Sequence, residues 1–239
     1  DVKTITMFTA FFLIFHTSQC YARYWKVYSL TRRMIGAAYD FSLLARLYMR
    51  PSGKPYDRIA TRLVAMTVML FFCQAKGEAR GQHKIMPGEW SKLIDMGLVT
   101  KEEYDFLQGF GGPQRSLVAL HAAGDLTRQG LTEAGTPGPM ANEVIQRLLR
   151  FRGFQQEAHD FLAVPAPFGY FHLVSFMVFF ILLIWAYGLG VTRSAFAPLC
   201  YVLVALLFMG MRELAAELAS PFGLGQGSEE EDPAASRWA

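Results

Sequence analysis

The chain has 239 residues, of which 52% are hydrophobic and 18% are charged, and its formal net charge is +3. This length allows one large domain or two small ones, and so small a charge argues against a nucleic-acid-binding surface. Its three cysteines, Cys20, Cys73 and Cys200, are odd in number and far apart, which excludes a disulfide framework and a zinc pattern. The apolar residues are concentrated in a few segments, and that concentration is the informative feature.

The first predicted element is a helix from about Val2 to the Arg23-Tyr24-Trp25 region. Its apolar core precedes aromatic and basic residues, an order typical of a helix that leaves a bilayer. Lys3, the apolar run and Cys20-Tyr21-Ala22 also resemble a signal peptide with its cleavage site. We expect a membrane helix and, because the chain begins with Asp, a processed or truncated start.

A basic flank follows this helix. Nine Lys or Arg residues between Arg23 and Arg62 face only Asp40 and Asp57, and the positive-inside rule places such a flank on the cytoplasmic or equivalent side. Arg23 and Lys26 are also candidates for raising the local anion concentration by electrostatic steering. The simpler interpretation is that these cations only set the orientation in the membrane.

The next 130 residues have the patterns of soluble helices. Residues 30–50 predict a helix that Pro51 to Pro55 ends, and a second helix is expected from Tyr56 to about Lys76. The apolar part of that second helix is too short to span a bilayer comfortably, so we predict a buried helix of a cytosolic region. Further helices are expected to begin at Pro87, at a capping box over 100–103, and at Asn142.

Two long segments without Lys, Arg, Asp or Glu come next, over residues 161–192 and 194–211. Each is long enough for a membrane helix, and a turn is expected from Gly188 to Ser194 between them. The sequence therefore predicts an all-α integral membrane protein. Its predicted parts are a neck or membrane helix (1–29), a helical cytosolic region (30–160), a transmembrane hairpin (161–220), and a Pro-Phe-Gly corner with an acidic tail (221–239).

Met7, Phe11 and Phe15 are spaced four apart, so they share one side of the first helix. Such a stripe is ordinarily a packing or lipid-facing surface. If several copies surrounded an axis with this face inward, the positive ring edges would favour a passing anion, and the apolar bulk would close the path by excluding water.

The order of several motifs resembles the bestrophin family. The motifs are the stretch His16 to Trp25, the segment Leu93 to Glu103, the stretch His159 to Pro165, and the corner Ser220 to Gly223. The resemblance implies a homopentameric anion channel with a large cytosolic region. It implies that Met7, Phe11 and Phe15 form the pore neck and that Leu162 forms a cytosolic aperture. Family members carry one more membrane helix ahead of the neck helix, and this sequence starts without it.

The resemblance also raises the possibility of a calcium clasp, because calcium-gated bestrophins carry acidic residues directly after the Pro-Phe-Gly corner. Here residues 224–228 contain no acid, Ser220 replaces Asn, and Glu217 replaces Gln. The acidic residues Glu229, Glu230 and Asp232 come later, so a loop would have to be ordered before they could bind Ca²⁺. We expect a solvated tail and calcium-independent or voltage-dependent gating, with the clasp as the alternative.

Other chemical sites find little support in the sequence. The glycines of residues 223–227 precede acids that would repel a phosphate, and the pair His159-Asp160 has no further ligand at metal spacing. No nucleophile elbow, carboxylate dyad or HExxH motif occurs, so we expect no enzyme.

The expected function is passive conduction of chloride or a similar anion by a homopentamer in a lipid bilayer. The sequence indicates no definite cofactor, and Ca²⁺ is the one candidate. A non-conducting accessory subunit of a larger membrane complex is the alternative. The plant-like stretch Tyr21 to Trp25 slightly favours a plastid thylakoid or another organelle membrane.

Overall fold

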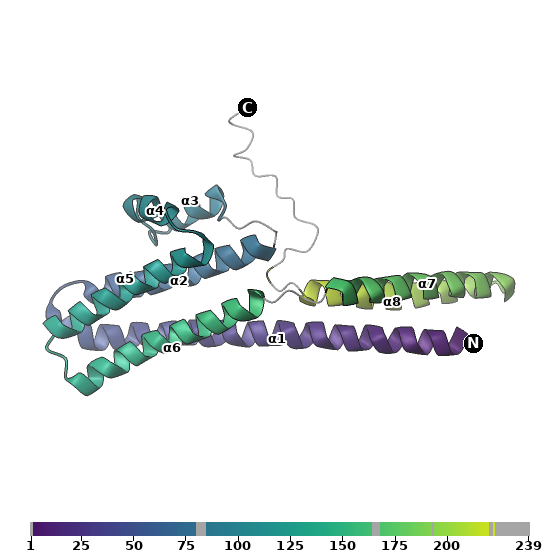
Figure 1. Ribbon diagram of the computed structural model, residues 1–239, viewed down its shortest axis with the longest axis horizontal. Helices are drawn as coiled ribbons and strands as arrows, with labels where there is room; N and C mark the ends of the chain where they lie inside the picture. The colour runs from purple at the N-terminus through teal and green to yellow at the C-terminus, as the bar shows by residue number, and fades with distance from the viewer. Residues whose placement is uncertain (1, 80–84, 164–167, 193, 220–221, 223–239) are drawn as a thin grey trace, which may run out of the picture. The chain divides into compact units, whose positions relative to one another are not determined.

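The computed structural model describes residues 2–79, 85–163, 168–192, 194–219 and 222 (Figure 1). Every regular element within these ranges is a helix, as predicted for an all-α protein. The elements are α1 (Val2–Met49), the 3-10 turn η1 (Arg50–Ser52), α2 (Tyr56–Ala79), α3 (Pro87–Asp95), α4 (Lys101–Gln108), α5 (Gly112–Glu133), α6 (Gly138–Ala163), α7 (Phe168–Thr192) and α8 (Ala197–Ala219).

The chain forms two compact units. Among the described residues, the hairpin unit consists of those up to Tyr24 and those from Phe168 onward, and the core unit consists of those from Trp25 to Ala163. The boundary predicted between residues 29 and 30 lies inside α1, so no break in secondary structure marks it. The predicted division into four parts stays a prediction.

Helix α1 corrects the prediction of two separate helices, since it runs through 48 residues without interruption. Neither glycine nor proline occurs between Trp25 and Leu30, so nothing in this stretch favours ending a helix. The first proline is Pro51, and the helix ends just before it, as expected. It lies in η1, and Gly53 follows in the left-handed region at φ 71°, where glycine carries no steric penalty.

The centre of the core unit is the pair α2 and α5, which lie side by side (Figure 1). Phe41 from α1 and Phe151 from α6 are fully buried in the same apolar cluster, together with Leu70 of α2. Close approach at α5 requires Gly130. A Cβ at this position would lie 2.7 Å from Cε of Met49 and 2.8 Å from Cβ of Tyr56.

Helix α4 is attached to α2 by one ion pair and begins at the predicted capping box. The Oγ1 of Thr100 accepts from the N–H of Glu103, and the Glu103 carboxylate accepts from the N–H of Thr100. The same carboxylate pairs with both terminal nitrogens of Arg62, at 2.6 and 2.7 Å. Arg62 also donates to the carbonyl of Leu98, so one arginine fixes the connection and the start of α4.

In the hairpin unit α7 and α8 pack against each other. The prediction of a turn beginning at Gly188 is wrong, because α7 continues to Thr192. Glycine costs about 1 kcal/mol in a helix, whereas an unsatisfied backbone group in lipid costs several. Continuing the helix through Gly188 and Gly190 is therefore favourable.

Three described helices are long and apolar enough to cross a membrane, at residues 56–77, 169–192 and 197–219. The last two are the predicted hairpin. The first is α2, whose apolar part we predict to be too short to span a bilayer comfortably and which is the most buried of the three. The start of α1 does not meet the same measure in the described residues, because Lys3, His16 and several threonines dilute its apolar run.

Candidate functional site

The predicted neck residues lie on the uncovered side of α1. The side chains of Met7, Phe11 and Phe15 are 77%, 61% and 48% exposed within the chain. The opposite side carries Thr9 and Leu13, which are buried. The sequence spacing thus selected a face that the hairpin unit itself leaves open. What meets this face stays a prediction.

The covered side of α1 packs on the α7–α8 hairpin. Leu13 forms an apolar cluster with Val174, Val178 and Ile181 of α7 and Phe208 of α8. Burial of such side chains contributes about 1.5–3 kcal/mol each relative to exposure in water, so this contact orients the helix. Because Leu13 faces the hairpin, the opposite side of α1, with Met7, Phe11 and Phe15, faces away from it.

Two side chains of α7 hold α1 by polar contacts that the sequence analysis missed. The hydroxyl of Tyr170 donates to the carbonyl of Phe12 at 3.4 Å, and Nε1 of Trp185 donates to Oγ1 of Thr6 at 3.2 Å. The Tyr170 ring also meets the ring of Phe15 edge to face, with centroids 6.3 Å apart. The signal for this role was the presence of Tyr and Trp in an apolar helix, since their polar atoms need partners when buried.

His16 is buried directly beside the neck face. Its ring packs edge to face on Tyr170 at 5.3 Å, and its Nε2 is 3.8 Å from Sγ of Cys20. No group of three His, Cys, Asp or Glu side chains with metal-binding geometry occurs among the described residues.

The two candidate steering cations have different surroundings. Nζ of Lys26 forms an ion pair with Glu157 of α6 at 2.7 Å. This contact lowers the pKa of the Glu157 carboxyl, chiefly through the hydrogen bond from Lys26. A carboxylate this close compensates much of the field of Lys26. Arg23 is partly buried in the hairpin unit, and the steering role of both residues stays a prediction.

The predicted aperture residue, Leu162, lies in the last turn of α6. It is partly buried and packs against the apolar cluster of the core unit. Contact with its own core fixes the place of this side chain within the unit. Its proposed role at a constriction depends on other copies of the chain and stays a prediction.

The doubtful calcium clasp is represented by one described residue. Glu217 is exposed near the end of α8. Ser220, Glu229, Glu230 and Asp232 lie outside the described residues. One exposed carboxylate supplies at most two of the six to eight oxygen ligands that Ca²⁺ prefers.

Comparisons with protein-family models, curated proteins and solved structures agree with one another. The family model described as "Bacterial/Fungal Bestrophin protein" matches residues 2–227. A voltage-dependent anion channel-forming protein of Mesorhizobium japonicum is 23% identical over 213 residues, which are 89% of this chain and 63% of that protein. The chain therefore spans less than two thirds of the length of this curated relative.

Solved structures with the same fold include two of a bacterial bestrophin homolog from Klebsiella pneumoniae. One has a TM-score of 0.75 at 19% identity and covers 98% of this chain and 81% of that chain. Another has a TM-score of 0.73 at 19% identity and covers 95% and 79%. These structures support the fold. The two apolar helices of the hairpin, of which α7 carries no Lys, Arg, Asp or Glu, support an integral membrane protein. The matched family model is bacterial and fungal, so the plastid membrane stays a prediction.

Proposed function

The chain belongs to the bestrophin family, and from that premise we propose that it forms a homopentameric, passive channel for chloride and similar monovalent anions. The channel-forming relative in Mesorhizobium japonicum supports this proposal by its name. The structure of the chain supports it as well, because the hairpin unit leaves one apolar face of α1 uncovered.

The observation that carries the proposal is the exposure of Met7, Phe11 and Phe15 along one side of α1. The three side chains follow about 12 Å of the helix axis. Five copies of this face around an axis would form a narrow apolar neck. Ring edges there attract an anion, while the apolar surface makes a water-filled path costly, so small movements open or close it.

Leu162 is proposed as a second, apolar constriction, and Arg23 and Lys26 as cations that raise the anion concentration nearby. The Lys26–Glu157 ion pair makes Lys26 the weaker contributor. Electrostatic steering of this kind falls as the ionic strength rises, because the Debye length is about 10 Å at 0.1 M salt.

The test is purified full-length protein reconstituted in planar bilayers with unequal KCl concentrations on the two sides. We expect a reversal potential near that of chloride. Phe11→Ala and Phe15→Ala each remove a ring from the neck, so the current should rise several-fold or lose its gating. Phe179→Ala on α7, an equally exposed phenylalanine, is the matched control and should leave the current unchanged.

A silent wild-type protein would contradict the channel and favour a non-conducting accessory subunit. Current that both neck variants leave unchanged would contradict the neck alone. We also propose that opening requires no calcium, because residues 224–228 carry no acid. Chelation of calcium in the same recordings should leave the current unchanged. Loss of the current on chelation would support the calcium clasp.

A further inference from the structure

The core unit presents an apolar stripe on α1 that its own described residues leave uncovered. Tyr39, Leu43 and Leu47 are 73%, 70% and 60% exposed. Their spacing of four places them on one side of the helix over about 12 Å of its axis. A helix face in water is ordinarily polar, so a continuous apolar stripe marks a surface that another molecule covers.

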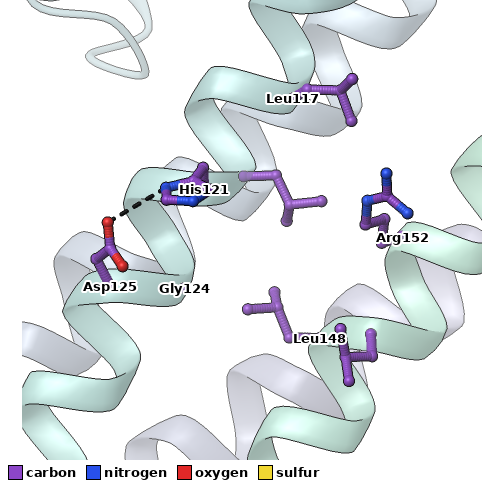
Figure 2. A pocket seen from close by; sticks show the side chains of 8 residues that line it. Leu117, His121, Gly124, Asp125, Leu148 and Arg152 are labelled. Atoms are coloured by element: carbon purple, nitrogen blue, oxygen red, sulfur yellow. Dashed lines mark ion pairs between the residues drawn. The ribbon is translucent and has the colours of Figure 1, made fainter.

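A second apolar surface lies between α5 and α6 in the same unit. It is a groove of about 320 Å³, and Figure 2 shows leucine side chains reaching into it from both helices. Leu120 and Leu148 are buried at its floor, while Leu117 and Leu149 are exposed. Gly124 adds no side chain, and this leaves room above Leu148.

The two edges of the groove carry opposite charges. The α5 edge carries Asp125, whose carboxylate is 3.2 Å from Nδ1 of His121 and is mostly exposed. The α6 edge carries Arg152, which has no ion pair within the described part of the chain. Figure 2 shows Arg152 across the groove from His121 and Asp125, with leucines between them.

The stripe on α1 is flanked by the complementary pair of charges. At 100° per residue, Asp40 and Arg46 lie about 60° to either side of Leu43. Asp40 accepts from Arg147 at 3.2 Å and is still 57% exposed. Arg46 is exposed and has no ion-pair partner among the residues described. One edge of the stripe therefore carries an exposed carboxylate, which it shares with Arg147, and the other edge carries a guanidinium.

We propose that the α1 stripe of one copy of this chain seats in the α5–α6 groove of the next copy. Seating the leucines of the stripe between the two edges places Arg46 against Asp125 and Asp40 against Arg152. The stripe and the groove are complementary in apolar surface and in the charges at their edges, and both are present on this chain. A second copy of the chain can therefore cover each of them. The contact joins two different surfaces, so it can repeat from copy to copy, and it closes a ring when the rotation between copies divides a full turn. This inference rests on the homopentamer proposed above and names its interface.

The experiment mixes two damaged forms of the full chain in detergent and measures their mass by native mass spectrometry. The stripe variant carries Leu43→Glu and Leu47→Glu, and the groove variant carries Leu117→Glu and Leu149→Glu. Each alone should lose assembly, with at least a tenfold weaker self-association. Mixed, they should form pairs with one copy of each, because the intact stripe of one meets the intact groove of the other. Phe106→Glu, at an equally exposed position on α4, should assemble as wild type does.

A milder pair of changes tests the same contact if the leucine variants fail to fold. Arg46→Asp and Asp125→Arg should each weaken assembly, and the two together in one chain should restore it. Restoration requires that the two residues meet between copies, since within one copy the structure places no contact between them.

The outcomes separate this proposal from the channel. If the wild type is oligomeric and all variants stay so, the interface is wrong and the homopentamer stands. If the damaged forms lose assembly but do not pair when mixed, the seating of stripe in groove is wrong. Anion current of the same wild-type preparation reports on the channel independently.

Discussion

Helix α2 and the α7–α8 hairpin have similar composition but different surroundings. All three helices are apolar and long enough to cross a membrane, yet 44% of the apolar span in α2 is buried within the chain, against 22% in α7 and 11% in α8. Helix α2 packs on α5 and contributes to the large apolar cluster of the core unit. The hairpin leaves most of its apolar surface without cover from the chain.

The polar residues also distinguish α2 from α7, because α2 carries charged and polar side chains that are buried or paired within the protein. Asp57 and Thr67 are buried in α2, and Arg62 of that helix pairs with Glu103. A helix with such groups needs protein partners at matching positions. Helix α7 carries no Lys, Arg, Asp or Glu. Composition therefore predicts that a helix must be covered, while the neighbouring elements decide whether protein or lipid covers it.

The largest expected effect breaks the cover of α2. Leu70→Ala removes a fully buried side chain, so the free energy of unfolding should fall by about 3 kcal/mol. Leu206→Ala on α8 removes an exposed one, and the change should stay within about 0.5 kcal/mol. Urea titration of the full chain in detergent, followed by tryptophan fluorescence, measures both. Equal losses would show that the two regions are covered alike.

A smaller effect is expected from the close approach of α5 to the start of α2. Gly130→Ala puts a methyl group within 3 Å of Met49 and Tyr56, which should cost about 2 kcal/mol of unfolding free energy. Gly124→Ala on the same helix meets only Leu148 at 3.7 Å, an ordinary contact, and alanine favours the helix by up to about 1 kcal/mol. If Gly130→Ala left the free energy of unfolding unchanged in the same titration, the side chains of Met49 and Tyr56 would move aside at little cost.

The smallest effect concerns the ion pair that attaches α4 to α2. Hydrogen bonds from Arg62, more than any other cause, hold the pKa of the Glu103 carboxyl below its ordinary value. Glu103→Gln keeps an acceptor for the capping box and removes the charge. Near pH 7 it should lower the free energy of unfolding by about 1 kcal/mol, because the pair is partly exposed.

The pH dependence of this pair has a definite sign. A carboxyl whose pKa is lower in the folded state stabilises the fold above its unfolded pKa, about 4.3, and this contribution disappears as the pH falls through the folded value. The difference between wild type and Glu103→Gln should therefore shrink below about pH 4. A difference that persists at pH 3 would assign the effect to packing and not to charge.

The helices were largely predictable because their signals are local. Pro51 and the capping box of Thr100 and Glu103 marked helix boundaries that the structure confirms. The errors also have local origins. Gly188 predicts a turn, although the backbone of α7 remains helical there. The aromatic and basic residues after Ala22 predict an exit from a bilayer, although α1 continues through them.

The surroundings of the candidate site were less predictable. The spacing of Met7, Phe11 and Phe15 identified one side of α1, but the hydrogen bonds from Tyr170 and Trp185 join residues more than 150 positions apart in the chain. The ion pair between Lys26 and Glu157 joins residues 131 positions apart. Such contacts depend on how whole helices pack, and a single sequence carries no periodic signal for them.

By itself, the sequence determined that this protein is helical, that two charge-free segments need a bilayer, and which side of α1 is continuously apolar. Those properties follow from side-chain spacing and composition, which act over a few turns of helix. Only the tertiary structure decided that α2 is covered by protein, that Leu13 and not Phe11 faces α7, and that the core unit keeps an open groove with one acidic and one basic edge. The physical reason is that burial is a property of pairs of distant surfaces, and the free energy of covering them is set only when the helices have packed.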